Sequence, residues 1–337
     1  MTCTAIAQAS SSAVILQYHH VANDTPASTT VSPEQFRQHM QYLQRHYQVW
    51  PLDKLIDAVK KDNSVPDNVV AITFDDGYLN ILQNAAPILK EFQFPYTIFI
   101  NPDEIGKRDN QLDWQQVKAM ADQQVLFANH SNGHLHLLQR QSAESEQAWL
   151  ERISNNILAA EDKLEQELGY SLKYLAYPYG EYNSALQSWL KKSGYTGFGQ
   201  HSGAFSTNSD FSALPRYPAA GVYASLDSLK VKLASLALPV KKNSIKDPEF
   251  QFGANYPDIQ LQLDSDDFNR DLFACFLKGQ RLKVDWSGGK AEIVVGQAMP
   301  VGRSRINCTV PSKTKKSRYY WYSQPFFVAD KNGNWLN

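Results

Sequence analysis

The sequence has no excess of either charge and no long apolar run. Its 33 lysines and arginines almost balance its 34 aspartates and glutamates, which gives a formal net charge of −1. The longest basic run is the short KTKK at residues 313–316, so the chain lacks the electrostatic footprint of a nucleic-acid-binding protein. Every apolar stretch falls well short of the roughly 20 residues that a membrane span requires. These absences favour a protein without a transmembrane segment.

Cysteine is scarce, with Cys3, Cys275 and Cys308 as its three occurrences. The first residues, MTCTAIAQA, resemble the end of a secretory signal because small and apolar residues lead to the A-x-A-like Ala7-Gln8-Ala9. We interpret residues 1–10 as the remnant of a signal peptide and predict an exported protein, periplasmic or extracellular; a cytosolic N-terminus is the alternative. Cys3 would leave with the signal. Cys275 and Cys308 would remain as an even pair, either bridged or buried as free thiols.

Strand-like and helix-like patterns alternate through residues 11–240. One helix opens at Ser32-Pro33, where Ser32 caps it and Gln35 completes a capping box. Such alternation implies right-handed crossovers and a parallel sheet, and the number of units favours a partial or distorted (β/α) barrel with its chemistry at the C-terminal strand ends. The predicted strands cover residues 13–18, 69–74, 96–100, 125–129, 174–178 and 195–199, and the predicted helices cover residues 81–92, 114–121, 142–168 and 184–192.

The pattern changes after Pro239. A connector containing proline and lysine leads into short runs such as IQLQL, LFACFL, AEIVV and RINCTV, which are separated by DSDD, KGQ and SGG turns. Several of these runs alternate apolar and polar residues, as half-buried antiparallel strands do. Residues 241–337 are therefore predicted to form a small β-sandwich domain after a catalytic barrel domain of residues 11–240. The aromatic run RYYWYSQPFF is interpreted as a core strand, with a second sugar-binding surface as the alternative.

Two adjacent carboxylates, Asp75 and Asp76, close the apolar strand VVAITF, and Gly77 permits a tight turn after them. Successive side chains on an extended backbone point in different directions, so one acid can bind a cation while the other faces another part of a pocket. A capping role for the pair at the start of the next helix is the structural alternative.

Three histidines lie within the segment NHSNGHLHL, directly after the strand that ends at residue 129. His130 and His134 are four residues apart, so on a helical turn they share one face and can chelate one ion. His136 lies off that face and is interpreted as a bystander. Two imidazoles and the Asp76 carboxylate leave positions open for water and substrate, as in a catalytic metal site. Asp75 is then free to act as a base toward the water that the metal activates.

The motifs TFDDG at 73–77, HSNGH at 130–134 and YPYG at 177–180 resemble the ordered motif set of the polysaccharide deacetylases, carbohydrate esterase family four. The resemblance covers roughly residues 14–218. LQYHHVA near the start and ALPRYPA around Arg216 look more like the branch of exported poly-β-1,6-N-acetylglucosamine deacetylases. The resemblance to the family implies a partial barrel and a divalent metal held by Asp76, His130 and His134. Zn²⁺ is the metal expected first, and Co²⁺ or Ni²⁺ are the alternatives. The resemblance also implies Asp75 as base and hydrolysis of N-acetyl groups on an amino-sugar glycan.

The same resemblance implies that Tyr179 lines the substrate groove and offers its backbone N–H to the oxyanion. We expect the groove to include Tyr177, Pro178, Gly180 and Arg216 as well. Further aromatic side chains near the motifs, Tyr182 and Trp114, either line the groove or belong to the core and the ordinary surface.

The chain departs from the family pattern at two points. Many members carry an arginine just before the PYG element, where this chain has Ala176 and Tyr177. Many also have a late Leu-x-His that supplies the general acid, but no histidine follows His201. We predict His19 as the acid, with His201 and His20 as alternatives or the metal alone stabilising the leaving amine.

These patterns predict a metal-dependent deacetylase that acts on a polysaccharide or oligosaccharide containing N-acetylglucosamine. A degenerate relative that binds glycan without cleaving it is the alternative from the binding class, favoured by the missing late histidine. A non-haem iron oxygenase shares the ligand set of two histidines and one carboxylate, but the strand-helix alternation argues against it.

Overall fold

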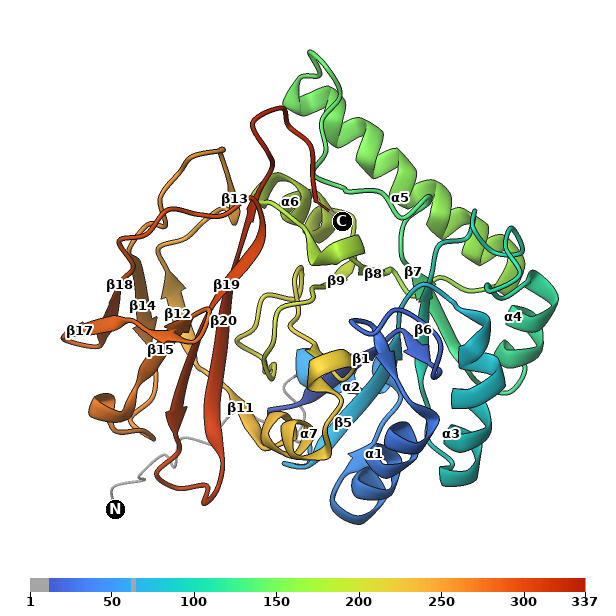
Figure 1. Cartoon of the computed structure of the whole chain (residues 1–337), viewed down its shortest axis with the longest axis horizontal. Helices are drawn as coiled ribbons and strands as arrows, with labels where there is room; N and C mark the ends of the chain where they lie inside the picture. Colours follow the sequence, from blue (N-terminus) through green and yellow to red (C-terminus); the bar gives the residue numbers. More distant parts are fainter. Residues whose placement is uncertain (1–11, 62–64, 337) are drawn as a thin grey trace.

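The computed structural model describes residues 12–61 and 65–336 (Figure 1). The predicted signal remnant at residues 1–10 therefore lies outside the described residues. Within the described part, no helix is both long enough and apolar enough to cross a membrane.

A curled sheet of parallel strands forms the first part of the chain. Its strand order is β10-β1-β5-β6-β7-β8-β9, every neighbouring pair is parallel, and a short β4 pairs with the start of β5. The predicted partial (β/α) barrel is thus confirmed. The strands are β1 (Val14–Tyr18), β4 (Gln48–Val49), β5 (Val69–Phe74), β6 (Thr97–Ile100), β7 (Leu126–Asn129), β8 (Tyr174–Ala176), β9 (Thr196–Phe198) and β10 (Tyr217–Pro218).

Helices follow most of the barrel strands, and α3, α4 and α5 lie along the outer side of the sheet in Figure 1. The capping box at Ser32 and Gln35 is present, and α5 ends at Gly169 in the left-handed conformation. α2 and α7 are two helices that the sequence patterns did not predict. The helices are α1 (Pro33–His46), α2 (Leu52–Lys60), α3 (Ala86–Phe92), α4 (Trp114–Ala121), α5 (Glu146–Leu168), α6 (Ser184–Lys192) and α7 (Leu226–Leu233), with a π-helical turn at Ile81–Ala85 before α3.

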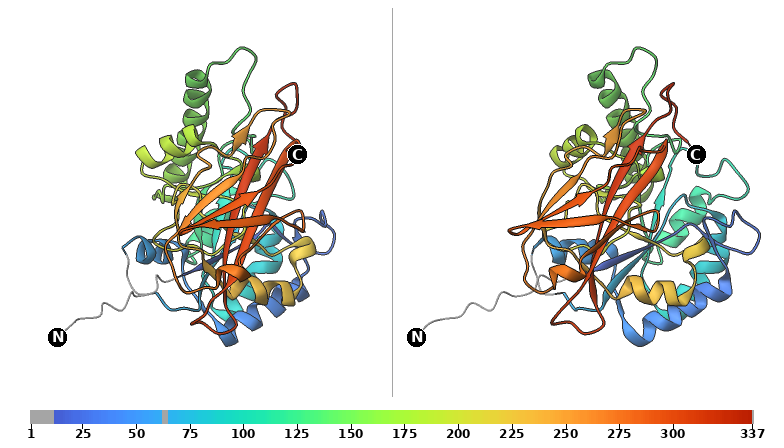
Figure 2. Two further views of the ribbon diagram at one scale, coloured as in Figure 1. Left: turned by 90° about the vertical axis from the view of Figure 1, so that its left-hand side faces the viewer. Right: turned by 60° about the vertical axis from the view of Figure 1, so that its left-hand side comes forward.

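A two-stranded sheet of β2 (His20–Val21) and β3 (Thr30–Val31) belongs to the barrel part. Two further sheets form the C-terminal part of the molecule, on the side away from α3 and α4 (Figures 1 and 2). They bury a common apolar core, to which Leu261, Ile293 and Ile306 contribute, so the predicted sandwich is confirmed as part of the fold class. One sheet holds β11 (Ser235–Ala237), β13 (Glu249–Phe250), β15 (Ala274–Leu277), β16 (Gln280–Arg281), β19 (Gly302–Pro311) and β20 (Tyr319–Val328). The other holds β12 (Val240–Asn243), β14 (Ile259–Leu263), β17 (Lys283–Ser287) and β18 (Lys290–Val294).

The sandwich is joined to the barrel by hydrogen bonds and by packing. β11 pairs in parallel with β20, so the sandwich sheet begins a few residues before the predicted domain boundary at 240/241, which itself stays a prediction. The outward residues of β20 pack on the barrel: Trp321 meets Tyr217 at 5.7 Å between ring centroids, and Phe327 meets Tyr182 at 5.4 Å. The aromatic run of β20 is therefore mainly a packing strand, as interpreted from its sequence.

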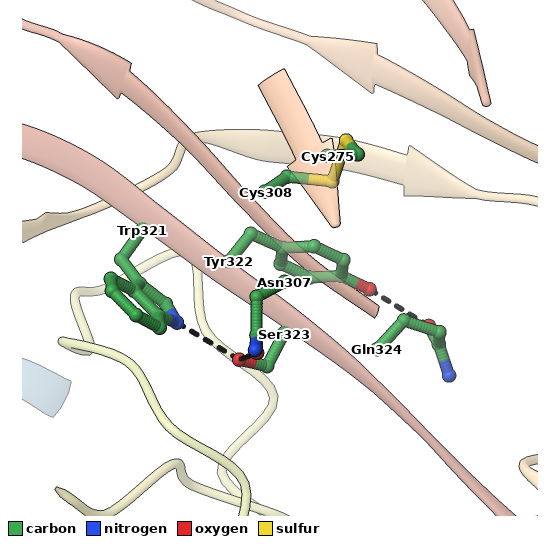
Figure 3. The surroundings of a disulfide bond; sticks show 7 residues. All are labelled: Cys275, Asn307, Cys308, Trp321, Tyr322, Ser323 and Gln324. Atoms are coloured by element: carbon green, nitrogen blue, oxygen red, sulfur yellow. Dashed lines mark hydrogen bonds between the residues drawn. A yellow bond between two sulfur atoms is a disulfide. The ribbon is translucent and has the colours of Figure 1, made fainter. Parts of the chain in front are cut away.

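A disulfide joins Cys275 of β15 to Cys308 of β19 (Figure 3). The two cysteines are direct cross-strand partners, and both are buried in the core of the sandwich. The sequence left bridged and free cysteines equally open because bridging depends on strand register. The antiparallel register of β15 and β19 resolves the question by placing the two residues opposite each other.

We expect removal of this bridge to destabilise the sandwich, because an open bridge releases conformational freedom in the unfolded chain. The double variant Cys275→Ala/Cys308→Ala should lose about 2–4 kcal/mol of unfolding free energy in urea titrations. Thiol titration of the denatured wild type should find two thiols fewer than the same sample after reduction. Equal thiol counts before and after reduction would contradict the bridge.

Candidate metal and catalytic site

The two carboxylates at the end of β5 face different partners because the backbone turns sharply there. Asp76 has φ of +72° and Gly77 has φ of +70°. Aspartate tolerates this left-handed conformation better than most residues. A Cβ on Gly77 would lie only 2.8 Å from Cγ2 of Ile100, so glycine is required on steric grounds as well.

Asp76, His130 and His134 converge at this strand end. Oδ1 of Asp76 lies 3.2 Å from Nε2 of His130 and 3.3 Å from Nε2 of His134. Oδ1 of Asp76 and Nε2 of His130 are buried and have no hydrogen-bond partner among the described residues. Buried polar atoms without partners are costly, and these two atoms together with Nε2 of His134 fit the donor set of a divalent metal.

The ring of His130 is held in the orientation that a ligand needs. Its Nδ1 donates to the carbonyl oxygen of Ala176 at 2.7 Å, which leaves the Nε2 lone pair toward Asp76. The side-chain amide of Asn101 donates to the carbonyl oxygens of His130 and Ser131, which fixes the backbone on the other side. Both strands that flank β7 therefore secure this histidine.

The electrostatics of this cluster keep Asp76 ionised. Burial pushes the pKa of Asp76 upward, but the facing imidazoles of His130 and His134 outweigh burial and hold that pKa well below its ordinary value. Burial likewise pushes the pKa of His130 downward, and the two carboxylates outweigh it and raise that pKa. The site thus attracts positive charge.

The expected helical turn at the two histidines is wrong. Residues 130–140 form bends and turns, and His134 has φ of +45°. The spacing of four residues still brings both rings to Asp76, because Ser131 and Gly133 also take positive φ values and fold the segment back on itself.

Asp75 is fully buried and is held by Arg216. The guanidinium of Arg216 donates to both carboxylate oxygens at 2.7 Å, and the side-chain amide of Gln17 donates to Oδ2 at 2.6 Å. Burial alone would raise the pKa of Asp75, but the charge of Arg216 outweighs burial and lowers it. Asp75 is therefore a carboxylate at neutral pH, able to accept a proton.

The prediction that Arg216 contacts substrate is wrong. Its side chain is fully buried, and besides Asp75 it donates to the carbonyl oxygen of Gly199 and to Thr73. No face of the guanidinium is left for a glycan, because Arg216 is enclosed beside β10 and positions Asp75.

The three histidines considered for the general acid differ in their surroundings. Nε2 of His19 lies 3.9 Å from Oδ2 of Asp75, and its side chain keeps 16% of its surface exposed. His20 stacks on Tyr78 instead, and burial lowers its pKa to about 4. His201 is half-buried near Tyr182, and burial lowers its pKa to about 3. Of the three, His19 alone faces Asp75.

The YPYG segment presents only part of itself to a substrate. Tyr177 is fully buried, and its hydroxyl donates to the carbonyl oxygen of Ser212, so the prediction that its ring lines the groove is wrong. Pro178 is buried too, and Gly180 is buried although it lines a neighbouring cavity. Tyr179, with φ of +58°, is the tyrosine of this segment that keeps accessible surface.

Tyr182 and Trp114, the other two aromatic candidates, belong to the core and to the ordinary surface. Tyr182 is only 6% exposed and belongs to a core cluster. Trp114 is half-buried at the start of α4, where the ammonium of Lys163 lies 5.7 Å from its ring centroid.

Tyr179 is held from two sides, and the sequence predicted neither contact. His136 stacks on its ring at 3.9 Å between centroids and 10° between planes, so His136 is not a bystander. The guanidinium of Arg303, from β19, lies 5.2 Å from the ring centroid on another side. The buried carboxylate of Glu181 binds both partners, at 2.8 Å to His136 and 3.2 Å to Arg303.

The comparison with known proteins follows the same motifs. The family model described as polysaccharide deacetylase matches residues 62–198. A Bacillus subtilis protein named for the same family is 30% identical over 206 residues, covering 60% of this chain and 69% of the relative. The chain belongs to the polysaccharide deacetylase family. Its members are hydrolases that act on amide bonds.

A second relative is the poly-β-1,6-N-acetyl-D-glucosamine N-deacetylase of Staphylococcus aureus, 28% identical over 193 residues and covering 56% of this chain and 67% of the relative. Two solved structures share the fold. The Streptococcus pyogenes deacetylase PplD, in complex with acetate, matches 66% of this chain and 99% of its own with a TM-score of 0.60 at 22% identity. IcaB from Ammonifex degensii matches 65% and 98% with a TM-score of 0.57 at 20% identity.

The Asp75–Arg216 pair yields a stability prediction. Arg216→Met leaves a buried carboxylate without its partner and should cost about 3–5 kcal/mol of unfolding free energy near neutral pH. Arg37→Met is the matched control, because Arg37 pairs with Glu91 at the surface and its loss should cost no more than about 1 kcal/mol. Urea titrations of both variants measure the difference.

The loss of unfolding free energy in Arg216→Met should also depend on pH. The lowered pKa of folded Asp75 means that the pair stabilises the wild type above roughly pH 4, the unfolded pKa, and that this contribution is lost as pH falls through the folded pKa. In Arg216→Met burial dominates and Asp75 binds a proton more readily, so the deficit should shrink in acid. A deficit that is constant between pH 7 and pH 3 would contradict this account.

Proposed function

We propose that the chain removes N-acetyl groups from a polysaccharide or oligosaccharide that contains N-acetylglucosamine. The observation that carries this proposal is the convergence of Asp76, His130 and His134 beside the ion-paired Asp75, within a chain of the deacetylase family. A metal-ligand set next to a buried carboxylate base is suited to hydrolysis of an unactivated amide.

Asp76, His130 and His134 would hold the divalent cation. Two imidazoles and one carboxylate suit Zn²⁺, and Co²⁺ or Ni²⁺ would fit the same donors. When bound, such a cation supplies Lewis acidity, which polarises a carbonyl oxygen and acidifies water. The unpartnered state of Oδ1 of Asp76 and Nε2 of His130 supports this assignment.

The chain's own groups then divide the proton transfers. Asp75 accepts the proton of the attacking water, and Arg216 and Gln17 hold its carboxylate in place while it does so. His19, beside Asp75 and partly exposed, donates a proton to the leaving amine. The backbone N–H of Tyr179 stabilises the oxyanion, at a residue whose ring is held by its neighbours.

Export to an oxidising compartment is part of the proposal. The bridge between Cys275 and Cys308 supports it, because structural disulfides persist outside the reducing cytosol. The name of the Staphylococcus aureus relative supports a glycan of β-1,6-linked N-acetylglucosamine as the first substrate to test.

Acetate release from purified protein tests the function. Oligomers of β-1,4-linked and of β-1,6-linked N-acetylglucosamine are supplied after chelation and again after Zn²⁺, Co²⁺ or Ni²⁺ is restored. We expect acetate only with metal restored. Asp75→Asn should lose at least about 10²-fold in rate while its metal content stays that of the wild type, since the metal ligands are untouched.

Two outcomes of that assay would contradict the proposal. An Asp75→Asn enzyme with wild-type turnover would refute the proposed base. Calorimetric binding of the oligomers without acetate under any metal would identify a glycan-binding relative that does not cleave its ligand.

The role of His19 is tested by changing the leaving group. His19→Asn should lower amide hydrolysis at least about 10²-fold, because an amine must be protonated to leave. Hydrolysis of 4-nitrophenyl acetate should change little, because nitrophenolate leaves without a proton. His46→Asn, at an exposed histidine at the end of α1, is the control. An equal loss on both substrates would show that His19 does not act as the acid.

A further inference from the structure

A cavity of about 500 Å³ lies where the sandwich meets the barrel, next to the candidate active site. From the barrel it is lined by Tyr179, Gln200 and Tyr223, and from the sandwich by side chains of β19 and of the turn after β15. Its volume is within the range of roughly 300–1,000 Å³ that is typical of ligand sites.

Strand alternation explains why β19 supplies polar side chains to this cavity. Ile306 and Cys308 face the apolar core of the sandwich. The odd-numbered residues of this stretch therefore face outward, toward the barrel, and Arg303, Arg305 and Asn307 all line the cavity. Asn307 is fixed there by Ser323 of β20, whose hydroxyl donates to it at 2.6 Å (Figure 3).

The cavity is positively charged. Arg303, Arg305 and Lys278 line it, and among the described residues that line it there is no aspartate or glutamate. Arg303 is engaged by Glu181 behind the cavity. Arg305 instead donates to the hydroxyl of Tyr223 at 3.3 Å, and no carboxylate of the described chain forms an ion pair with it. The charge of Arg305 also acts on Lys232. Burial is the largest cause that lowers the pKa of Lys232 to about 7, and the positive charge of Arg305 is the second.

The side chain of Tyr179 connects the cavity to the cluster of Asp76, His130 and His134. The ring of Tyr179 lies 4.6 Å from the ring of His134 on one side, between centroids. On another side it lies 5.2 Å from the guanidinium of Arg303. A glycan whose N-acetylated sugar reaches His134 would therefore place a neighbouring sugar along β19.

We propose that β19 completes the glycan groove with a subsite, centred on Arg305 and Lys278, that binds an anionic substituent on a sugar next to the one being deacetylated. The preferred substrate is then an N-acetylglucosamine glycan that also bears carboxylate or phosphate, over a neutral oligomer of the same length. Neither Arg305 nor Lys278 forms an ion pair with a carboxylate among the described residues. Two such cations in a partly enclosed cavity favour an anionic group, because arginine binds carboxylate and phosphate through two parallel N–H donors. This inference rests on the proposed function.

The test compares acidic and neutral oligosaccharides of equal length on the metal-loaded full chain. One acidic substrate alternates N-acetylglucosamine with glucuronic acid, a second is an N-acetylglucosamine oligomer carrying phosphate, and the neutral one is the plain oligomer. We expect the wild type to show kcat/KM about tenfold higher for at least one acidic oligomer, the value of one charge-assisted hydrogen bond. Which acid is preferred identifies the anion.

Variants of Arg305 assign that preference to the subsite. Arg305→Gln should lower the ratio of acidic to neutral kcat/KM about tenfold, Arg305→Lys should keep most of it, and high salt should weaken it in the wild type. Arg45→Gln, the same substitution at an exposed residue of α1, should leave the ratio unchanged. No acidic preference in the wild type, or an unchanged ratio in Arg305→Gln, overturns the proposal.

Direct binding separates this proposal from the catalytic one. If no oligomer releases acetate, the proposed function fails, and calorimetry with the same acidic oligomers still decides the subsite. A dissociation constant that is about tenfold weaker in Arg305→Gln than in the wild type supports it. Equal dissociation constants overturn it.

Discussion

The buried ion pair between Asp75 and Arg216 is the interaction on which the arrangement of the site depends. An unpaired carboxylate at the buried tip of β5 would be protonated or would destabilise the fold by several kcal/mol. Arg216 reaches Asp75 because β10 and β5 both pair with β1 in the curled sheet. Once Asp75 is fixed by the guanidinium, the positive φ of Asp76 directs the second carboxylate to the imidazoles on the loop after β7. Two like charges on adjacent residues are thus tolerated because each has its own cationic or metal-binding environment.

Much of this framework follows from the sequence. Strand β5 and helix α4 have the predicted bounds, because continuous apolar runs and capping residues are local signals. The meeting of Asp76, His130 and His134 was predictable for a different reason: parallel strands end at one edge of their sheet, so residues that follow two strand ends become neighbours. The ring of His19 beside Asp75 has the same origin, since His19 follows β1.

The parts that could not be predicted depend on the direction of side chains and on contacts between distant segments. Arg216 and Tyr177 stand in recognisable motifs, yet both are enclosed, and sequence position does not reveal which way a residue near a strand end points. A signal existed for Gln17, a polar residue within an apolar strand. For the contacts of His136, Glu181 and Arg303 around Tyr179 there was no signal, because they join the loop after β7, the turn after β8 and strand β19, which are far apart in the chain.

The parallel pairing of β11 with β20 has a consequence for how a ligand enters. The last barrel helix, α7, leads directly into β11, which is hydrogen-bonded within the sandwich, so no flexible linker separates the two parts at this point. The ion pair of Arg140 with Glu249 of β13 also crosses between them. Opening them would also break the aromatic packing of Trp321 on Tyr217. The side of the cavity that β19 forms is therefore preorganised, with Arg305 in place before any ligand arrives. Such rigidity favours selection among glycans by shape and charge, with little entropy lost by the protein on binding.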